Sequence, residues 1–369
     1  MLKFNLLAAA IFSLLAISAL ASEVTTNFNS DDVLSAQSLT DLKSAINDNN
    51  AKINALQGTP NLPGLYKVSQ VGGFSDVAYI QLDANNFYTI YYEKGVNKLH
   101  STSRGVYTTI NNQLLLSGGL MNYNLTPAGQ LTLSTPDFTT VAIKSTDDVS
   151  NWVINVNVID SITVSTTSAT DLAWDGTLLW MGNAYGGSNL FAINPSAHTI
   201  SSSVSTTNYA WGVEWENGNL WLSDDGSENI MRFTLSGNTL TSDLTVSGLG
   251  PWVNAISWDG SNIWAYSDNN SSITKFNPAT PTTLTVYNVP RLSGMTFIGG
   301  NLFVVASNAI HKLSTANFVS SASYYINAPS GTSYSIQGLA WDGSNMWASV
   351  SEYSSGTSVV KVLKLDLVP

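Results

Sequence analysis

The sequence contains no cysteine, only three histidines and few charged residues among its 369 positions. Without cysteine the chain can form neither disulfides nor thiolate metal sites, and a lipid anchor on an N-terminal cysteine is excluded. Charged residues make up 11% of the chain, and 14 basic against 25 acidic residues give a net charge of −11. Because nucleic acids and anionic membranes are themselves negatively charged, neither is expected as a partner.

Recognisable catalytic motifs are absent as well. The sequence has no Gly-x-Ser-x-Gly elbow, no phosphate-binding or dinucleotide-binding glycine loop, no His-Glu-x-x-His and no EF-hand loop. The three histidines, His100, His198 and His311, are far apart in the chain. We therefore expect a protein that binds rather than one that catalyses.

The first 21 residues have the features of a secretory signal peptide. Lys3 supplies a positive charge, residues 6–20 form a short apolar stretch, and Ala19-Leu20-Ala21 is a small-x-small cleavage site. The sequence thus predicts a secreted or periplasmic protein, with an uncleaved membrane anchor as the alternative. Residues 22–37 are polar and are predicted to be a linker.

Residues 38–58 are predicted to form a short coiled-coil helix. Ser38 can cap its start, and Gly58 and Pro60 can end it. The seam residues alternate at spacings of three and four, namely Leu39, Leu42, Ile46, Asn49, Ile53 and Leu56. This pattern predicts self-association through residues 38–57; the alternative is an amphipathic helix against one of the chain's own domains.

Residues 62–147 are predicted to form a small all-β barrel. Alternating apolar residues mark eight strands, at residues 64–71, 77–82, 87–93, 104–110, 113–117, 120–125, 130–134 and 138–144. The opening Gly64-Leu65-Tyr66 and the hairpins around Asn85-Asn86 and Asn111-Asn112 resemble the lipocalin-like domains of exported bacterial proteins. A barrel this small is filled mainly by its own side chains, so we interpret it as a spacer or interaction module.

The rest of the chain, residues 152–369, contains five copies of one short phrase. An aromatic residue, a turn such as Asp175-Gly176 and a second aromatic six positions after the first recur at Trp174/Trp180, Trp215/Trp221, Trp258/Trp264, Phe297/Phe303 and Trp341/Trp347. The copies are 41, 43, 39 and 44 residues apart. A period near 40 made of short β-segments is typical of a β-propeller with four strands, a to d, in each blade. We therefore predict an all-β chain whose larger domain is a five-bladed propeller.

The fifth repeat ends before its outer strand. Only four residues follow the strand predicted at residues 359–365, whereas residues 153–164 form a strand upstream of the first repeat. We expect residues 153–164 to complete the fifth blade and close the ring, since closure removes a free sheet edge.

These repeats resemble the exported propellers of the streptogramin-lyase-like, gluconolactonase-like and NHL groups. The resemblance lies in the phrase Leu339-Ala340-Trp341-Asp342-Gly343-Ser344-Asn345-Met346-Trp347 and in the Ser-Asp that follows strand b. This resemblance implies a β-propeller fold and says little about function. The histidine base that the resemblance implies for a lyase has no counterpart among the loops of the predicted binding face.

Propeller ligands usually bind where the loops before strand a and after strand b gather, which we call the upper face. The loops before strand a place Tyr209, Trp211, Trp252, Asn254, Arg291, Tyr334 and Gln337 there. The loops after strand b place Asn183, Tyr185, Asp224, Asp225, Asp268, Asn269, Asn308, Glu352 and Tyr353 there. Aromatic rings beside carboxylates and amides are typical of sugar sites, and the same oxygens could bind calcium. Alternatively, Trp211 and Trp252 plug the channel, and Asp224 and Asp268 cap their own turns.

The sequence therefore leaves three functions open. The first is an exported, non-enzymatic binding protein whose upper face holds a ligand such as a carbohydrate. The second is a metal-assisted propeller lyase or lactonase using carboxylates such as Asp224 and Asp268. The third is a scaffold that binds another protein.

Overall fold

A computed structural model describes Ser44 and residues 62–70, 76–110, 113–116, 119–183, 189–206, 210–224 and 228–367. The predicted signal peptide and linker lie outside these residues, and Ser44, which is helical and exposed, is the single described residue of the predicted coiled coil. Those three expectations thus stay predictions. The part of the chain that is described contains no helix long and apolar enough to cross a membrane. Contacts divide the chain into Met1–Leu62 and Pro63–Pro369, and the second unit is described below.

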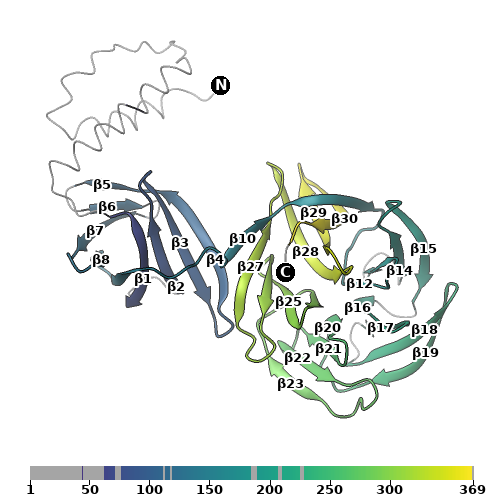
Figure 1. The fold of residues 1–369 in the computed structure, drawn as a ribbon. Coiled ribbons are helices and arrows are strands. Elements are labelled where there is room, and N and C mark those ends of the chain that lie inside the picture. Colours follow the sequence, from purple (N-terminus) through teal and green to yellow (C-terminus); the bar gives the residue numbers. More distant parts are fainter. Residues whose placement is uncertain are drawn as a thin grey trace, which may run out of the picture. The chain divides into compact units, whose positions relative to one another are not determined.

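The first part of this unit is one antiparallel, nearly closed barrel-like sheet in the order β4-β3-β2-β1-β9-β8-β7-β6-β5 (Figure 1). Alternate side chains such as Tyr66, Leu82 and Leu131 are buried inside it, which explains the period-two pattern. Its strands are β1 Gly64–Gln70, β2 Val77–Leu82, β3 Phe87–Lys94, β4 Leu99–Val106, β5 Thr108–Ile110, β6 Gln113–Leu116, β7 Gly119–Leu125, β8 Gln130–Ser134 and β9 Thr139–Ser145.

One predicted strand of this sheet is wrong. Residues 104–110 form the end of β4 and all of β5, two strands that pair with different neighbours, β3 and β6. The chain leaves the sheet edge at Tyr107, whose hydroxyl donates to the Asp83 carbonyl at 2.8 Å and whose N–H donates to the Asn86 carbonyl at 2.8 Å. These two hydrogen bonds hold the bend between β4 and β5, which the alternation of apolar residues does not predict.

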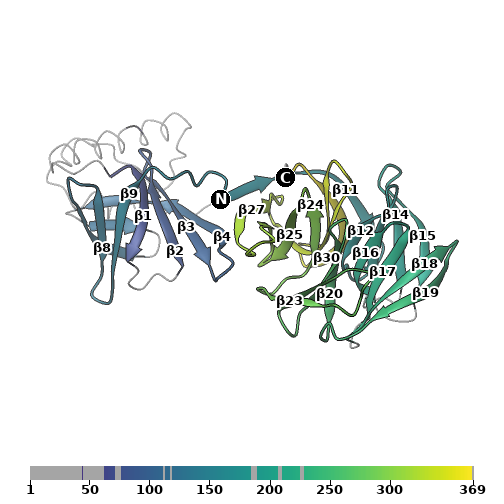
Figure 2. The ribbon, with the colours of Figure 1, turned by 60° about the horizontal axis from the view of Figure 1, so that its bottom comes forward.

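The second part is a five-bladed propeller, as predicted (Figure 1). The inner strands surround the axis and the outer strands lie at the periphery, and Figure 2 shows the strands of each blade side by side. The first three blades consist of β12 Leu172–Trp174, β13 Leu179–Asn183, β14 Asn189–Asn194 and β15 Thr199–Ser205; β16 Ala210–Glu216, β17 Asn219–Asp224, β18 Ile230–Ser236 and β19 Thr239–Val246; and β20 Val253–Trp258, β21 Ile263–Ser267, β22 Ser272–Phe276 and β23 Thr285–Asn288.

The last two blades include the strands that precede the first repeat. Blade four contains β24 Met295–Ile298, β25 Asn301–Ala306, β26 Ala309–Leu313 and β27 Ser320–Ile326, and blade five contains β28 Thr332–Trp341, β29 Met346–Ser354 and β30 Thr357–Leu365. The segment expected as one strand at residues 153–164 is divided. Its second half, β11 Val158–Val164, pairs with β30 in blade five, whereas β10 Val153–Val156 runs parallel to β27 in blade four.

The repeated aromatics pack the blades against one another. The second aromatic of one blade meets the first aromatic of the next: Trp180 stacks on Trp215 with ring centroids 5.8 Å apart, and Trp264 packs on Phe297 at 5.2 Å. Trp347 of blade five shares a core cluster with Trp174 of blade one, which closes the circle. This arrangement explains why both aromatics recur in every copy.

The acidic residue after the first aromatic serves the second aromatic. The indole N–H of Trp180, Trp264 and Trp347 donates to the turn carboxylates Asp175, Asp259 and Asp342 at 2.7 to 2.8 Å, and Trp221 donates to Glu216 at 3.0 Å. In blade four the second aromatic is Phe303, which has no N–H, and Ile298 stands at the position of the acid. The acid is therefore present where an indole needs a partner and absent where it does not.

Candidate functional site

Near the propeller axis the inner strands of neighbouring blades lie very close to one another. Three residues before the first aromatic, the five copies carry Asp171, Gly212, Ala255, Gly294 and Gly338, and the inner strands approach one another closely at this level. A Cβ on Gly338 would lie 2.5 Å from the Cα of Asp171, and a Cβ on Gly294 would lie 2.5 Å from the Gln337 carbonyl oxygen. Any side chain is thus excluded at Gly338 and Gly294, and Asp171 is the one acid at this level.

Asp171 is buried on the axis and joins three blades. Its residue is 1% exposed, and its Oδ2 accepts the backbone N–H groups of Val213 at 3.3 Å and Ile256 at 3.0 Å. Its Oδ1 has no hydrogen-bond partner among the described residues. Burial raises the pKa of this carboxyl well above its usual value; the backbone N–H groups oppose that shift, and nearby Glu214 adds to it.

Glu214 lies one layer away, immediately before the first aromatic of its blade, where the other copies carry Ala173, Ser257, Thr296 and Ala340. Its Oε1 accepts the Trp215 N–H at 2.7 Å and its Oε2 accepts the Trp258 N–H at 2.9 Å. The residue is half-buried, and burial raises its pKa to about 7. We refer to Asp171 and Glu214 as the axial acids. Sequence reasoning missed them, although each is the one acid in a column of small residues.

Trp252, in the loop before strand a of blade three, is one of the exposed aromatics among the described residues. Its residue is 51% exposed and its backbone has a φ of 57°, a left-handed conformation that bulky residues rarely adopt. Two hydrogen bonds fix the loop: the Asp268 N–H donates to the Trp252 carbonyl at 2.9 Å, and the Ser267 hydroxyl donates to the Pro251 carbonyl at 2.6 Å. The indole is thus presented to solvent by a firmly held backbone.

Two of the other predicted ligand residues lie beside this loop. The Arg291 guanidinium donates to Asp268 Oδ2 at 2.9 Å, with side chains that are 81% and 13% exposed, respectively. The hydroxyl of Tyr266 donates to Asp268 Oδ1 at 3.3 Å, and burial raises the pKa of Tyr266 to about 12. Trp252, Asp268 and Arg291 therefore form one group, which we call the Trp252 patch.

Three predicted residues share a different feature. Trp211, Asn254 and Gln337 each lie at an irregularity in the pairing of an inner strand, where a bulge re-aims the side chain. All three are half-buried, and the Gln337 amide donates to the Ser335 hydroxyl at 2.9 Å.

Two further predicted residues, Glu352 and Asn308, have partners outside the Trp252 patch. Glu352 is paired with Lys361 and lines a separate groove, described below. Asn308 supports blade five, since its amide donates to the Tyr334 carbonyl at 2.6 Å and accepts the Ile336 N–H at 3.0 Å. Tyr185, Tyr209 and the side chain of Asp224 lie outside the described residues, so their assignment stays a prediction.

The histidines lie away from the upper face. His311 is buried in β26 between the Ser323 hydroxyl and the Ala306 carbonyl, and burial lowers its pKa to about 4, so it is neutral at physiological pH. His198 lies in the turn between β14 and β15, and its Nε2 is 2.9 Å from Oδ2 of Asp160 in β11. His100 is buried in β4. Within the described ranges, no three histidine, aspartate or glutamate residues are arranged to hold a metal ion.

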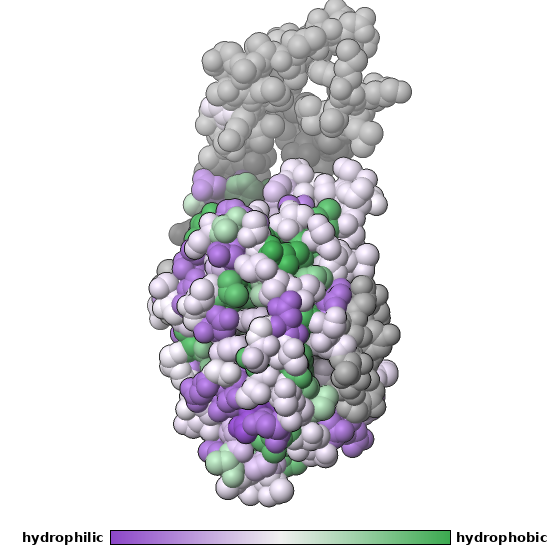
Figure 3. Space-filling view, turned by 90° about the vertical axis from the view of Figure 1, so that its right-hand side faces the viewer, coloured by the Kyte–Doolittle hydropathy of each residue, from purple (hydrophilic) through white to green (hydrophobic). Residues whose placement is uncertain are grey.

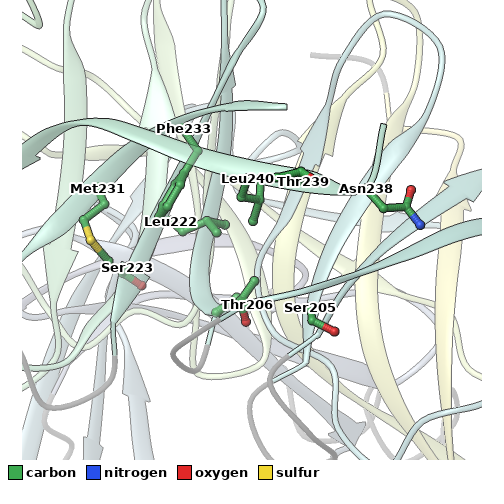
Figure 4. Close-up of a pocket in the computed structure, with 10 residues that line it drawn as sticks. Ser205, Thr206, Leu222, Ser223, Met231, Phe233, Asn238, Thr239 and Leu240 are labelled. Atoms are coloured by element: carbon green, nitrogen blue, oxygen red, sulfur yellow. The ribbon is translucent and has the colours of Figure 1, made fainter. Parts of the chain in front are cut away.

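A small cavity of about 250 Å³ lies between blades one and two (Figure 4). Leu222, Met231, Phe233 and Leu240 form its apolar lining, and the hydroxyls of Ser205, Thr206 and Ser223 are at its edge. It contains no charged side chain. The face of the molecule shown in Figure 3 mixes hydrophilic residues with residues of intermediate hydropathy, and apolar residues are scattered among them.

No family model and no curated protein matches the sequence. Solved structures similar to the chain include Myxococcus xanthus glutaminyl cyclase, with a TM-score of 0.45, 12% identity and coverage of 58% of this chain and 99% of that one. A catalytically inactive virginiamycin B lyase from Staphylococcus aureus with quinupristin has a TM-score of 0.35, 12% identity and coverage of 82% and 100%. Kuenenia stuttgartiensis hydrazine synthase has a TM-score of 0.34, 10% identity and coverage of 53% and 58%. These likenesses are too distant to carry an argument about function.

Proposed function

We propose that the protein is an exported binding protein that holds a carbohydrate at the Trp252 patch. The observation that carries this proposal is the exposed Trp252 in a strained backbone conformation. A non-glycine residue in the left-handed region costs about 1–3 kcal/mol and persists only where the surrounding structure imposes it. About half of the residue is exposed, so packing of the indole accounts for only part of this cost. A ligand that stacks on the indole would explain why it is kept.

The neighbouring groups suit a sugar. An indole face binds the C–H face of a pyranose ring, and the hydroxyls around that ring need both donors and acceptors. Arg291 supplies donors and Asp268 supplies an acceptor, and their mutual pairing leaves the patch without a large net charge. A neutral glycan therefore fits this patch better than a strongly charged one. Export and self-association through residues 38–57 remain part of the proposal and depend on the sequence alone.

The test compares Trp252→Ala with Trp211→Ala on a glycan array and by titration calorimetry. Loss of the stacking platform should weaken glycan binding by about 1–2 kcal/mol, roughly ten- to thirtyfold, in the Trp252 variant. The Trp211 variant is the matched control, because it removes a half-buried indole from the neighbouring blade. Unchanged glycan affinity in Trp252→Ala, with thermal unfolding unaltered, contradicts the proposal.

The second candidate is a propeller lyase or lactonase. One observation favours catalysis of some kind: a half-buried glutamic acid with a pKa of about 7 is poised for proton transfer near neutral pH. Hydrolysis or elimination of lactones and cyclic esters that Glu214→Gln abolishes would support this candidate. Retention of full activity in that variant would remove Glu214 from the reaction.

A further inference from the structure

A second cavity, of about 550 Å³, lies between blades four and five, where the ring closes. Its wall comes from the segment that joins β27 to β28, from β28, β29 and β30, and from the closing strand β11. We call it the closure groove. Its volume lies within the range of about 300–1,000 Å³ that is usual for small-molecule sites.

Blade five departs from the repeat to build this groove. In the first four blades strand b ends three residues after the second aromatic, at Asn183, Asp224, Ser267 and Ala306, whereas β29 continues to Ser354, seven residues after Trp347. Its partner β28 starts nine residues before Trp341, earlier than any other inner strand. Tyr334 and Glu352 are paired across this extension, so the wall of the groove is specific to one blade.

The extension carries a compensated pair of charges. The Lys361 ammonium donates to both carboxylate oxygens of Glu352, at 2.8 and 2.9 Å, and both side chains are mostly buried. Val158 and Leu363 supply apolar surface, and the hydroxyls of Tyr334, Ser161 and Thr332 belong to the same lining.

We infer that the closure groove binds a neutral saccharide. A ligand with a net charge of either sign would compete with one member of the Glu352–Lys361 pair and leave the other uncompensated, which is strongly unfavourable in a partly buried site. An apolar ligand would cover the pair without hydrogen bonds, which also costs free energy. A neutral ring with several hydroxyls satisfies carboxylate, ammonium and phenol together and still places C–H groups on Val158 and Leu363.

The small cavity between blades one and two, described above, serves as a control for saccharide binding. It occupies the corresponding place, formed by the end of one outer strand and the side of the next blade, but it is smaller and uncharged. The same saccharide should not bind there, because its lining offers hydroxyls without a carboxylate or an ammonium group.

The experiment titrates the full chain with glucose, galactose, mannose and N-acetylglucosamine, and with glucuronate as a charged comparator, while backbone amide signals are followed by NMR. At least one neutral sugar should shift the signals of Tyr334, Glu352 and Lys361 and leave those of Thr206 and Leu222 unchanged. Glu352→Gln should weaken that sugar about tenfold and strengthen glucuronate, since Lys361 then lacks its counter-ion. Tyr334→Phe should weaken the neutral sugar and leave glucuronate weak.

The outcome is independent of the Trp252 patch. Trp252→Ala should leave the shifts at Tyr334 and Glu352 unchanged, so failure of the first proposal does not imply failure of the second. If no neutral sugar moves the signals of the groove, or if Glu352→Gln keeps both affinities while remaining folded by thermal unfolding, the inference is overturned.

Discussion

The propeller contains two sets of acidic side chains that differ in repetition, and their environments differ accordingly. The turn acids Asp175, Glu216, Asp259 and Asp342 recur with the blades, lie in the turns between the first two strands and accept indole N–H groups. The axial acids occur once each, lie on the axis and accept backbone N–H groups from other blades. A repeated acid therefore stabilises one blade, whereas a unique acid connects several.

Asp259 and Asp342 also differ from the axial acids in the direction of their pKa shifts. Burial alone would raise the pKa of Asp259 and Asp342, but the hydrogen bonds from the Trp264 or Trp347 indole and from Asn262 or Asn345 outweigh it and lower the pKa. Burial dominates at the axial acids and raises their pKa. Asp259 and Asp342 thus lose their contribution to stability as the pH falls, and the axial acids lose theirs as the pH rises.

The largest effect is expected for Asp171→Ala. The substitution leaves the N–H groups of Val213 and Ile256 buried without a partner, at about 1–3 kcal/mol for each. We expect the free energy of unfolding to fall by about 3 kcal/mol or more, measured by chemical denaturation. Asp171→Asn keeps one carbonyl acceptor and should lose less. Equal losses in the two variants would show that the N–H groups do not need the acceptor.

The raised pKa of Glu214 predicts an unusual dependence of stability on pH. Its pKa is about 7 in the folded chain against 4.5 for the ordinary side chain. Because the folded state holds the proton more tightly, the contribution of Glu214 to stability should be largest below about pH 4.5 and should decline as the pH rises to about 7, by about 2–3 kcal/mol for a shift of this size.

Chemical denaturation of the wild type and Glu214→Gln between pH 4 and 8 measures this dependence. The glutamine variant cannot ionise at this position, so the decline caused by Glu214 should be absent from its curve, and any decline that remains belongs to other groups such as Asp171. A difference in stability between the two proteins that stays constant with pH over this window would contradict the raised pKa of Glu214.

The repeated features could be predicted from the sequence, and the unique ones could not. Both aromatics of each copy and the count of five blades follow from periodicity, because blade packing requires the same side chains each time. The corner at Tyr107 and the division of residues 153–164 between two blades depend on contacts with distant residues such as Asp83 and Ser323. For the site, loop chemistry indicated Trp252, Asp268 and Arg291 but missed the axial acids, whose burial depends on how closely Gly294 and Gly338 bring the inner strands together.

The smallest effect is expected at the repeated acids, and blade four shows how to isolate it. Asp259→Ala removes the acceptor of the Trp264 indole, which is 2% exposed, and should cost about 1–2 kcal/mol because a buried donor is left unpaired. In a Trp264→Phe background the donor is gone, as it is naturally at Phe303, so Asp259→Ala should cost about 1 kcal/mol less. Denaturation of the two single variants and the double variant gives this coupling energy. A coupling near zero would mean that the acid serves only its own turn, through the N–H groups of Ser261 and Asn262 that it also accepts, and that the absence of an acid beside Phe303 has no connection with the missing indole.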